Sequence, residues 1–170
     1  HIGFIMMGFA VTSPTSIVHI SFYLFMYMFM TLGAFSVLIL FNNKYEFNSV
    51  DDWSGIGYIH PFLCSLMAIN LIALAGLPPT SGFVAKFYIF STILESRSFY
   101  WLAIVAILNT VVALYYYFNL IRAMFFEKAS TVKYKKPEAI MIFIIVFTSI
   151  QGILFYFYWS RIYELIRGLI

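Results

Sequence analysis

Charged residues are scarce in this chain, and their scarcity defines its class. Asp, Glu, Lys and Arg make up only 10% of the 170 residues, whereas hydrophobic residues make up 63%. Ordinary soluble domains carry about 25% charged residues, so a soluble globular fold is excluded. Apolar runs long enough to cross a bilayer, about 20 residues, recur along the chain with short polar connections. The sequence therefore predicts a membrane protein with several spans.

Cysteine and the motifs of enzymes are also missing. The single cysteine, Cys64, stands in an apolar segment, so an intramolecular disulfide and a cysteine-based metal or cluster site are excluded. The sequence has no phosphate-binding loop, no glycine-rich dinucleotide motif, no nucleophile elbow and no clustered metal ligands. We therefore expect no bond-making chemistry and no bound cofactor or metal in this chain. Cys64 is interpreted as a small packing residue.

The alternation of apolar and polar residues that marks the strands of a membrane β-barrel is absent, for example from residues 140–147. The expected fold is all-α: a polytopic transmembrane helix bundle over residues 1–170, with one discontinuous helix. A short apolar run at the start is interpreted as the end of a helix whose beginning is missing. The helices are expected at residues 2–11 (this partial helix), 19–41, 61–77, 81–94, 99–125 and 139–159.

The discontinuous helix is expected where the segments 61–77 and 81–94 meet at a Pro-Pro turn. Prolines lack a backbone N–H group and push the preceding residue out of the helical region, so the first segment stops near Leu77. Thr80 and Ser81 can cap the next helix. Both segments are short for a span, which is typical of the broken helices that line transporter cavities. The residues assigned to this break are Gly76, Pro78, Pro79 and Gly82.

Lys86 is the one charge that stands well inside an apolar run. A helix that starts at Ser81 places Lys86 about 8 Å along its axis, at about 1.5 Å per residue. In one interpretation the side chain stretches back to the membrane interface. In the other it is buried in the bundle and faces a cavity or a partner. Desolvation and the positive end of the helix dipole would then let the group gain and lose protons.

Three further residues are candidates for proton relay. His19 and His60 stand at expected helix ends, which favours solvated or capping side chains, although histidine also titrates in the physiological range. Asn70 lies inside an apolar segment, where its ordinary role is a hydrogen bond between helices. Residues of this kind can also line a water path.

The order of the segments predicts which connections share a side of the membrane. Counting each short segment as one crossing places the Pro-Pro turn and the loop after Ile121 on one face, and the loop 42–59 and the C-terminus on the other. Basic residues cluster between Arg122 and Lys136. This cluster indicates that its face is the cytoplasmic or mitochondrial matrix side.

Four elements carry a resemblance to a known family: His1-Ile2-Gly3-Phe4, Tyr27 with Leu32-Gly33-Ala34-Phe35, the stretch from Leu74 to Phe87, and Leu114-Tyr115-Tyr116-Tyr117. In order and spacing they resemble the antiporter-like, proton-pumping membrane subunits of respiratory complex I, most closely the family of NADH dehydrogenase subunit 2. The specific element is Gly-Leu-Pro-Pro-x-x-Gly-Phe-x-x-Lys-Phe. The chain resembles only the C-terminal part of the family.

This resemblance implies a role in proton translocation coupled to quinone reduction, with Lys86 in the family's central row of charged and polar groups. It implies no redox cofactor here, but FMN, iron-sulfur clusters and ubiquinone in partner subunits. The implied partners are other complex I subunits, including neighbouring antiporter-like subunits and a separate chain that supplies the N-terminal half of subunit 2. The Phe, Tyr, Ile, Asn and Lys content favours an AT-rich mitochondrial genome, hence the mitochondrial inner membrane, with the bacterial plasma membrane as the alternative.

Two other functions remain open from the sequence. The chain could be a subunit of a monovalent-cation/proton antiporter, a class that shares the same ancestral helices. It could also be a structural helper that completes a bundle without moving protons.

Overall fold

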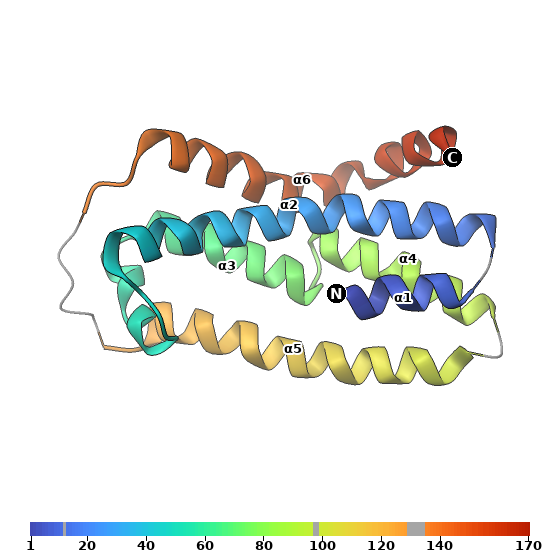
Figure 1. The fold of residues 1–170 in the computed structure, drawn as a ribbon, viewed down its shortest axis with the longest axis horizontal. Helices are drawn as coiled ribbons and strands as arrows, with labels where there is room; N and C mark the ends of the chain where they lie inside the picture. Colours follow the sequence, from blue (N-terminus) through green and yellow to red (C-terminus); the bar gives the residue numbers. More distant parts are fainter. Residues whose placement is uncertain (12, 97–98, 129–134) are drawn as a thin grey trace.

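The computed structural model describes residues 1–11, 13–96, 99–128 and 135–170. These residues form an all-α fold, which confirms the predicted fold class (Figure 1). Two short 3-10 helices, η1 and η2, precede α3. The elements are α1 (Ile2–Ala10), α2 (Pro14–Tyr45), η1 (Asp51–Trp53), η2 (Ile56–Tyr58), α3 (Pro61–Ala75), α4 (Ser81–Glu95), α5 (Tyr100–Phe126) and α6 (Ala139–Leu169).

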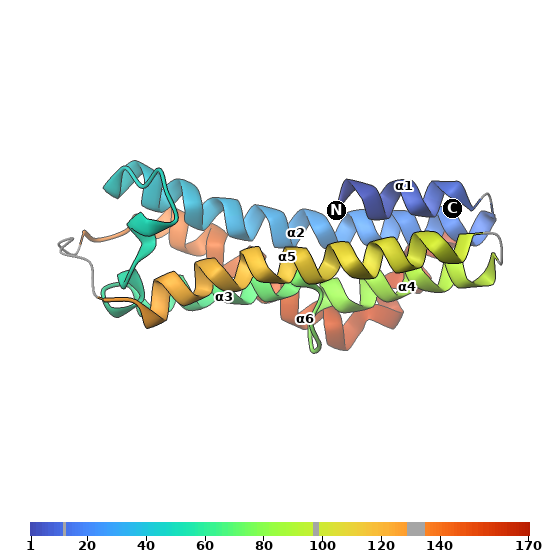
Figure 2. The same ribbon diagram turned by 90° about the horizontal axis from the view of Figure 1, so that it is seen from below.

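The helices lie side by side in an elongated bundle with α2 at its centre. Helix α2 packs against α1, α3, α4 and α6, while α5 lies on the other side of α3 and α4 from α6 (Figures 1 and 2). The short helix α1 runs from the middle of the bundle to one end, beside α2 and α4. The core is therefore built around α2 and the two short helices, and α5 and α6 form its flanks.

Helices α3 and α4 follow one another end to end, so together they cross the bundle once (Figures 1 and 2). The break between them lies in the middle of the bundle. The sequence-based placement of the Pro-Pro turn on a membrane face is therefore wrong. It was wrong because each short segment was counted as a full crossing.

The same miscount misplaced the loops. The segment after α2 and the segment after α5 lie at the same end of the bundle, where the first bonds to α5 and the second bonds to α2. Gly55 N–H donates to Ala123 C=O at 2.9 Å, and Lys135 N–H donates to Tyr45 OH at 2.8 Å. This end, called the basic end below, carries the basic residues Lys44, Arg122, Lys128, Lys135 and Lys136.

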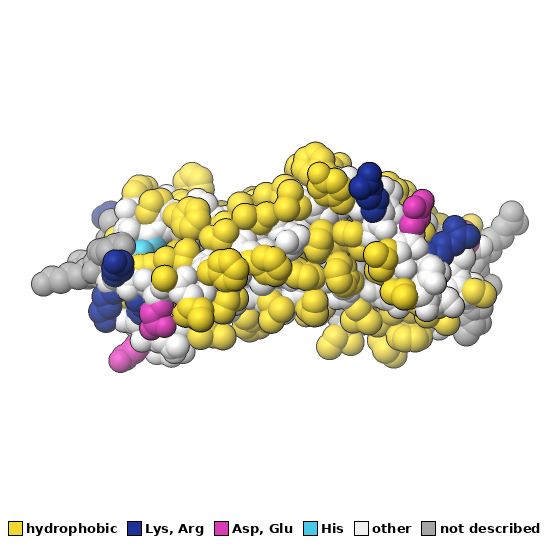
Figure 3. Space-filling model, turned by 90° about the horizontal axis from the view of Figure 1, so that it is seen from above, with side chains coloured by type: hydrophobic (Ala, Val, Ile, Leu, Met, Phe, Trp, Pro, Cys, Tyr) yellow, Lys and Arg dark blue, Asp and Glu magenta, His cyan; other side chains and the backbone are white. Residues whose placement is uncertain are grey.

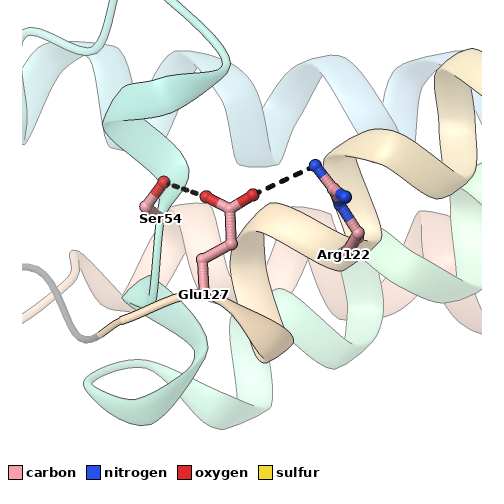
Figure 4. Close-up of polar contacts among 3 residues, drawn as sticks. All are labelled: Ser54, Arg122 and Glu127. Atoms are coloured by element: carbon pink, nitrogen blue, oxygen red, sulfur yellow. Dashed lines mark hydrogen bonds and ion pairs between the residues drawn. The ribbon is translucent and has the colours of Figure 1, made fainter.

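The Glu127 carboxylate links two segments at the basic end. Ser54 Oγ donates to Glu127 Oε2 at 2.6 Å, and Arg122 pairs with Glu127 Oε1 at 3.4 Å (Figure 4). Arg122 is well exposed, so the ion pair itself contributes little stability. The carboxylate nevertheless joins the 3-10 segment to the last turn of α5.

Helices α2, α5 and α6 are each long and apolar enough to cross a membrane. The segment Asp51–Tyr58 and helix α3 form a bent pair with an angle of 119° between them. An apolar band covers the middle of the face drawn in Figure 3, and charged side chains gather at its two ends. This distribution is that of a bundle surrounded by lipid.

Two helices extend beyond the ranges expected from the sequence. Helix α2 starts at Pro14, where proline occupies the first turn and Ser13 Oγ accepts from Ser16 N–H at 3.2 Å. Helix α6 continues to Leu169, so its expected end at residue 159 is wrong. Its late charges, Arg161, Glu164 and Arg167, are spaced three residues apart, which a helix accommodates on one side.

Glycines let the central helices approach closely around the break. A Cβ atom on Gly82 of α4 would lie 1.8 Å from Ala73 C=O, and one on Gly33 of α2 would lie 2.6 Å from Asn70 Oδ1. These distances are shorter than van der Waals contact. Gly82 therefore lets the backbones of α3 and α4 meet, and Gly33 makes room on α2 for the Asn70 side chain. This close packing positions the site.

Candidate functional site

Lys86 lies in the second turn of α4, next to the helix break and deep in the bundle. Its side chain is only 6% exposed. Its Nζ donates to Ala75 C=O at 2.7 Å and stands 5.1 Å from the centre of the Phe4 ring. The side chain therefore reaches back to the break in mid-bundle and does not extend to the membrane interface.

The break supplies the acceptor for this ammonium group. Helix α3 ends at Gly76, whose φ of +79° suits glycine, and Gly76 N–H bonds to Ile72 C=O and Ala73 C=O. Ala75 C=O belongs to the negative C-terminal end of the α3 dipole. Lys86 thus lies between the negative end of α3 and the positive end of α4, whereas the sequence argument considered only α4.

Gly76 also provides the space for the lysine. A Cβ atom there would lie 2.7 Å from Lys86 Cδ. Thr80 occupies the N-cap position of α4 as expected, but its hydroxyl donates to Leu77 C=O at 2.6 Å instead of capping the helix. Pro78 and Pro79, joined by a cis peptide bond, are exposed in the loop that projects from the bundle in Figure 2.

Lys86 lines a cleft between α1, α4 and α5 with a volume of about 630 Å³. The opposite wall, on α5, carries the polar side chains of Asn109, Thr110 and Tyr117. Asn109 Nδ2 and Thr110 Oγ1 both donate to carbonyls of their own helix, at 2.9 Å in each case. The α5 wall of this mainly apolar cleft therefore carries polar side chains, two of which already bond to their own helix.

His1 joins three tyrosines beside this cleft. Its Nδ1 lies 2.7 Å from Tyr23 OH, its Nε2 lies 3.3 Å from Tyr117 OH, and its ring stacks on Tyr27 with 4.7 Å between ring centres. Tyr23 is only 1% exposed. We call Lys86, His1, Tyr23 and Tyr117 the central polar cluster.

The sequence analysis did not identify His1, Tyr23 or Tyr117 as site residues. His1 and Tyr117 belong there only to the elements that carry the family resemblance, and Tyr23 is not named. One signal was present, because Tyr23 and Tyr27 are four residues apart and so share a face of α2. Nothing in the pattern paired that face with α1 and α5, which requires the tertiary structure.

The two histidine candidates lie at opposite ends of the bundle. His19 is only 6% exposed, with Nδ1 2.5 Å from Thr92 Oγ1 and Nε2 3.0 Å from Tyr163 OH. The expected solvated or capping role for His19 is therefore wrong. His60 precedes α3 at the basic end, where it is also buried and bonds to Tyr45 OH at 2.6 Å; it makes no side-chain cap bond.

Asn70 lies inside the core and joins α3 to α6. Its Nδ2 donates to Leu66 C=O at 2.9 Å and to Ser149 Oγ at 2.7 Å, so it makes the expected interhelical bond. Its Oδ1 faces Gly33, and no hydrogen-bond partner for this atom is found among the residues that the structure describes. Lys86, His19, His60 and Asn70 thus occupy four separate places.

Within the described parts of the chain, no group of three or more His, Cys, Asp and Glu side chains is placed to hold a metal ion. Cys64 is buried as a free thiol in the apolar core, in agreement with a packing role.

Comparison with known proteins identifies the class. Residues 1–113 match the family model described as NADH:quinone oxidoreductase/Mrp antiporter, TM, and the chain belongs to this family of membrane proteins. The matched region contains the central helices, the break and Lys86.

Curated relatives refine the comparison. The chain is 41% identical over 128 residues to NADH-quinone oxidoreductase subunit N of Trichlorobacter lovleyi, an alignment that covers 75% of this chain and 26% of the relative. It is 33% identical over 172 residues to subunit N 2 of Sorangium cellulosum, covering 98% of this chain and 33% of that protein. The chain therefore spans only about a quarter to a third of the length of these relatives.

A solved structure shares the fold. The chain superimposes on part of respiratory complex I from Thermus thermophilus with bound aureothin, with a TM-score of 0.79 over 95% of this chain and 36% of that one. Sequence identity is 18%, so this likeness supports the fold alone.

Proposed function

We propose that this chain is the C-terminal portion of a subunit N, or subunit 2, of respiratory complex I, and that it contributes to proton translocation coupled to quinone reduction. The names of the curated relatives support this assignment. The observation that carries the mechanism is Lys86, buried against Ala75 C=O at a helix break inside the bundle. A buried ionisable group in a membrane span is the usual mark of an ion or proton path.

Lys86 acts in this proposal as the proton-binding group. Its ammonium form is stabilised by Ala75 C=O and the Phe4 ring, and both interactions weaken when the proton leaves. A charge that arrives about 8 Å away changes the energy of the ammonium by roughly 2 kcal/mol at an effective dielectric constant near 20. That exceeds a tenfold change in proton affinity, which takes about 1.4 kcal/mol. A charge movement that follows quinone reduction elsewhere can therefore change the protonation of Lys86.

The central polar cluster offers the neighbouring groups. His1 lines the same cleft as Lys86 and bonds to the hydroxyl groups of Tyr23 and Tyr117. Imidazole and hydroxyl groups can each accept and donate a proton. Protons exchanged with Lys86 pass along these groups and the water in the cleft.

The test is proton transport by the reconstituted complex that carries Lys86→Arg. Arginine keeps the positive charge but does not deprotonate. We expect full assembly with a lower proton-to-electron ratio, while Lys128→Arg at the basic end leaves that ratio unchanged. A wild-type ratio in fully assembled Lys86→Arg enzyme would show that Lys86 is not a proton carrier.

The missing part of the subunit is proposed to cover the cleft between α1 and α5. The relatives are three to four times as long as the aligned segment, and only 6% of the most hydrophobic window of α5 is buried in this chain. We propose that N-terminal helices, from a separate polypeptide or from a longer form of this chain, pack there beside the neighbouring antiporter-like subunits. The intact mass of the subunit in the purified complex distinguishes these two sources.

The proposed location is the mitochondrial inner membrane, with the basic end on the matrix side. The corrected topology strengthens this orientation, because Lys44 now joins the basic residues that follow α5. Flavin, iron-sulfur clusters and ubiquinone belong to the partner subunits. Fractionation of the source cells tests the location, and protease access to residues 44–60 tests the orientation.

A monovalent-cation/proton antiporter subunit is the second candidate, because the matched family also includes Mrp antiporters. Co-purification separates the two. Partners that carry flavin and iron-sulfur clusters support complex I, whereas a complex free of redox cofactors would remove the first proposal.

A further inference from the structure

A second polar cluster lies between the central polar cluster and the end of the bundle opposite the basic end. It consists of His19 on α2, Thr92 on α4 and Tyr163 on α6, and we call it the His19 cluster. Three helices from distant parts of the chain thus supply one group each. The His19 ring also contacts the Tyr88 ring, with 4.9 Å between their centres.

The partners of His19 are hydroxyl groups on both ring nitrogens. Thr92 Oγ1 donates to Tyr88 C=O at 3.1 Å, so its oxygen accepts from His19 Nδ1–H. Nε2 of the neutral ring then accepts from Tyr163 O–H at 3.0 Å. When Nε2 takes up a proton, it becomes a donor, and the Tyr163 hydroxyl turns to accept from it. Hydroxyl rotation alone therefore lets the cluster hold either protonation state.

The position of His19 connects the middle of the bundle with this end. His19 is four residues before Tyr23 on α2, so both side chains project from one face of the helix. Thr92 lies six residues beyond Lys86, about 9 Å further along α4 at about 1.5 Å per residue. The exposed carboxylate of Glu95 follows within the next turn of α4.

Apolar residues block a direct proton path along α4 from Lys86 to Thr92. Ile89 and Ile93, which share a face with Lys86, are fully buried apolar residues. The polar groups instead follow the α2 face, from Tyr27 through Tyr23 to His19. A proton that leaves the central polar cluster toward this end thus meets His19 as the next imidazole.

We propose that His19 releases protons from the central polar cluster to the membrane face opposite the basic end. This inference rests on the proposed function. The imidazole takes up a proton at Nε2 and gives it up again from Nε2, while Nδ1–H stays bonded to Thr92 Oγ1, so both its charge and its tautomer are restored after each transfer. The titratable groups beside it are Tyr88 and Glu95 on α4 and Tyr163 on α6, and Tyr23 follows one turn along α2.

The test compares reconstituted complexes that carry His19→Gln, Lys86→Arg and Tyr88→Phe. Glutamine can still bond to the two hydroxyl groups but cannot take up and release a proton. We expect His19→Gln to lower proton pumping to the level of Lys86→Arg, with wild-type complex assembly. Tyr88→Phe is the matched control because it keeps the aromatic ring beside His19, and it should pump as the wild type does.

The outcomes separate the two proposals. Wild-type pumping by assembled His19→Gln together with reduced pumping by Lys86→Arg would overturn the role of His19 and leave the proposed function intact. Wild-type pumping by both variants would overturn both. A loss in Tyr88→Phe equal to that in His19→Gln would assign the defect to packing and so also overturn the release role.

A second variant covers the case in which His19→Gln fails to assemble. Tyr163→Phe removes only the hydroxyl group that pairs with His19 Nε2 and keeps the ring stacked on Tyr88 at 4.6 Å. We expect its pumping rate to show a pH profile displaced from that of the wild type, because the protonated ring loses its acceptor. An unchanged profile in assembled Tyr163→Phe enzyme would contradict the release role.

Discussion

Two of the segments that connect the helices, one inside the bundle and one at the basic end, satisfy their backbone polar groups in different ways. At the interior break, residues 76–80, the free carbonyls of α3 are met from within the chain by Gly76 N–H, Leu77 N–H and the Lys86 ammonium. In the end segment, residues 46–60, the partners are an exposed carboxylate, Asp52, and the backbone of α5, through Gly55 N–H and Ala123 C=O.

The difference follows from the solvent at each place. Water can satisfy any backbone group that the end segment leaves unpaired, so this segment can carry ordinary loop residues. Lipid and packed side chains offer no such partner, so each polar group at the interior break needs one from the protein. The interior break therefore has little tolerance for change. It is also where a buried charged side chain finds a hydrogen-bond partner, as Lys86 does at Ala75 C=O.

The largest effect is expected from Gly82→Ala at the interior break. The new Cβ atom would lie 1.8 Å from Ala73 C=O, which is backbone and cannot turn aside. The helices must separate, at a cost of about 3 kcal/mol, the upper part of the usual range for overpacking. The amount of assembled complex and the resistance of the solubilised protein to unfolding in SDS measure this loss.

Gly168→Ala is the control for that change. Nothing lies within 4 Å of a Cβ atom at Gly168, near the end of α6. Alanine there gains helix propensity, about 0.8 kcal/mol relative to glycine in a helix interior, so the variant should be as stable as the wild type or slightly more stable. Equal stability of the two alanine variants would show that the helices at the break are not closely packed.

The sequence was sufficient for the fold class and for the short helices that flank the break. Hydropathy and the prolines act locally, and both are visible in residues 61–94. The position of the break in the middle of the bundle could not be predicted from these local signals. Whether two short segments make two crossings or one depends on their lengths relative to the whole bundle, and both alternatives satisfy the hydropathy pattern.

The candidate site was predictable only in part. Lys86 stands out in the sequence because it is a lone charge in an apolar run. Its acceptor, Ala75 C=O, is a backbone atom and has no sequence signal at all. His19 was assigned to a helix end because the sequence could not show that Thr92 and Tyr163 meet it from two other helices.

An intermediate effect is expected from Asn70, which fastens α3 to α6 just before the break. Asn70→Ala removes the bonds to Leu66 C=O and Ser149 Oγ, and it should cost about 1–2 kcal/mol. Ser149→Ala removes only the bond between the helices. In a double-mutant cycle we expect a coupling energy of about 0.6 kcal/mol, typical of such bonds in membrane proteins.

SDS unfolding of the wild type, both single variants and the double variant gives this coupling energy. Strictly additive losses would mean that Asn70 and Ser149 do not stabilise each other. In that case the α3 to α6 contact next to the break would depend on apolar packing alone.

The smallest effect is expected in the end segment, from Asp52→Asn. Asp52 Oδ2 accepts from Asn48 N–H at 2.8 Å and from Ser49 N–H at 2.7 Å, and these bonds lower the pKa of the carboxyl group below its ordinary value. A lowered pKa stabilises the folded protein above the ordinary pKa of aspartate, and this contribution is lost as the pH falls through the lowered value. Asp52→Asn should therefore be slightly less stable than the wild type at pH 7 and equally stable at about pH 2. Thermal unfolding of the solubilised protein at both pH values measures the difference.

Asp51→Asn, the same charge change one residue away, controls for net charge. A stability difference that persists unchanged at low pH, or an equal loss in Asp51→Asn, would show that the two backbone bonds to the carboxylate do not stabilise the segment.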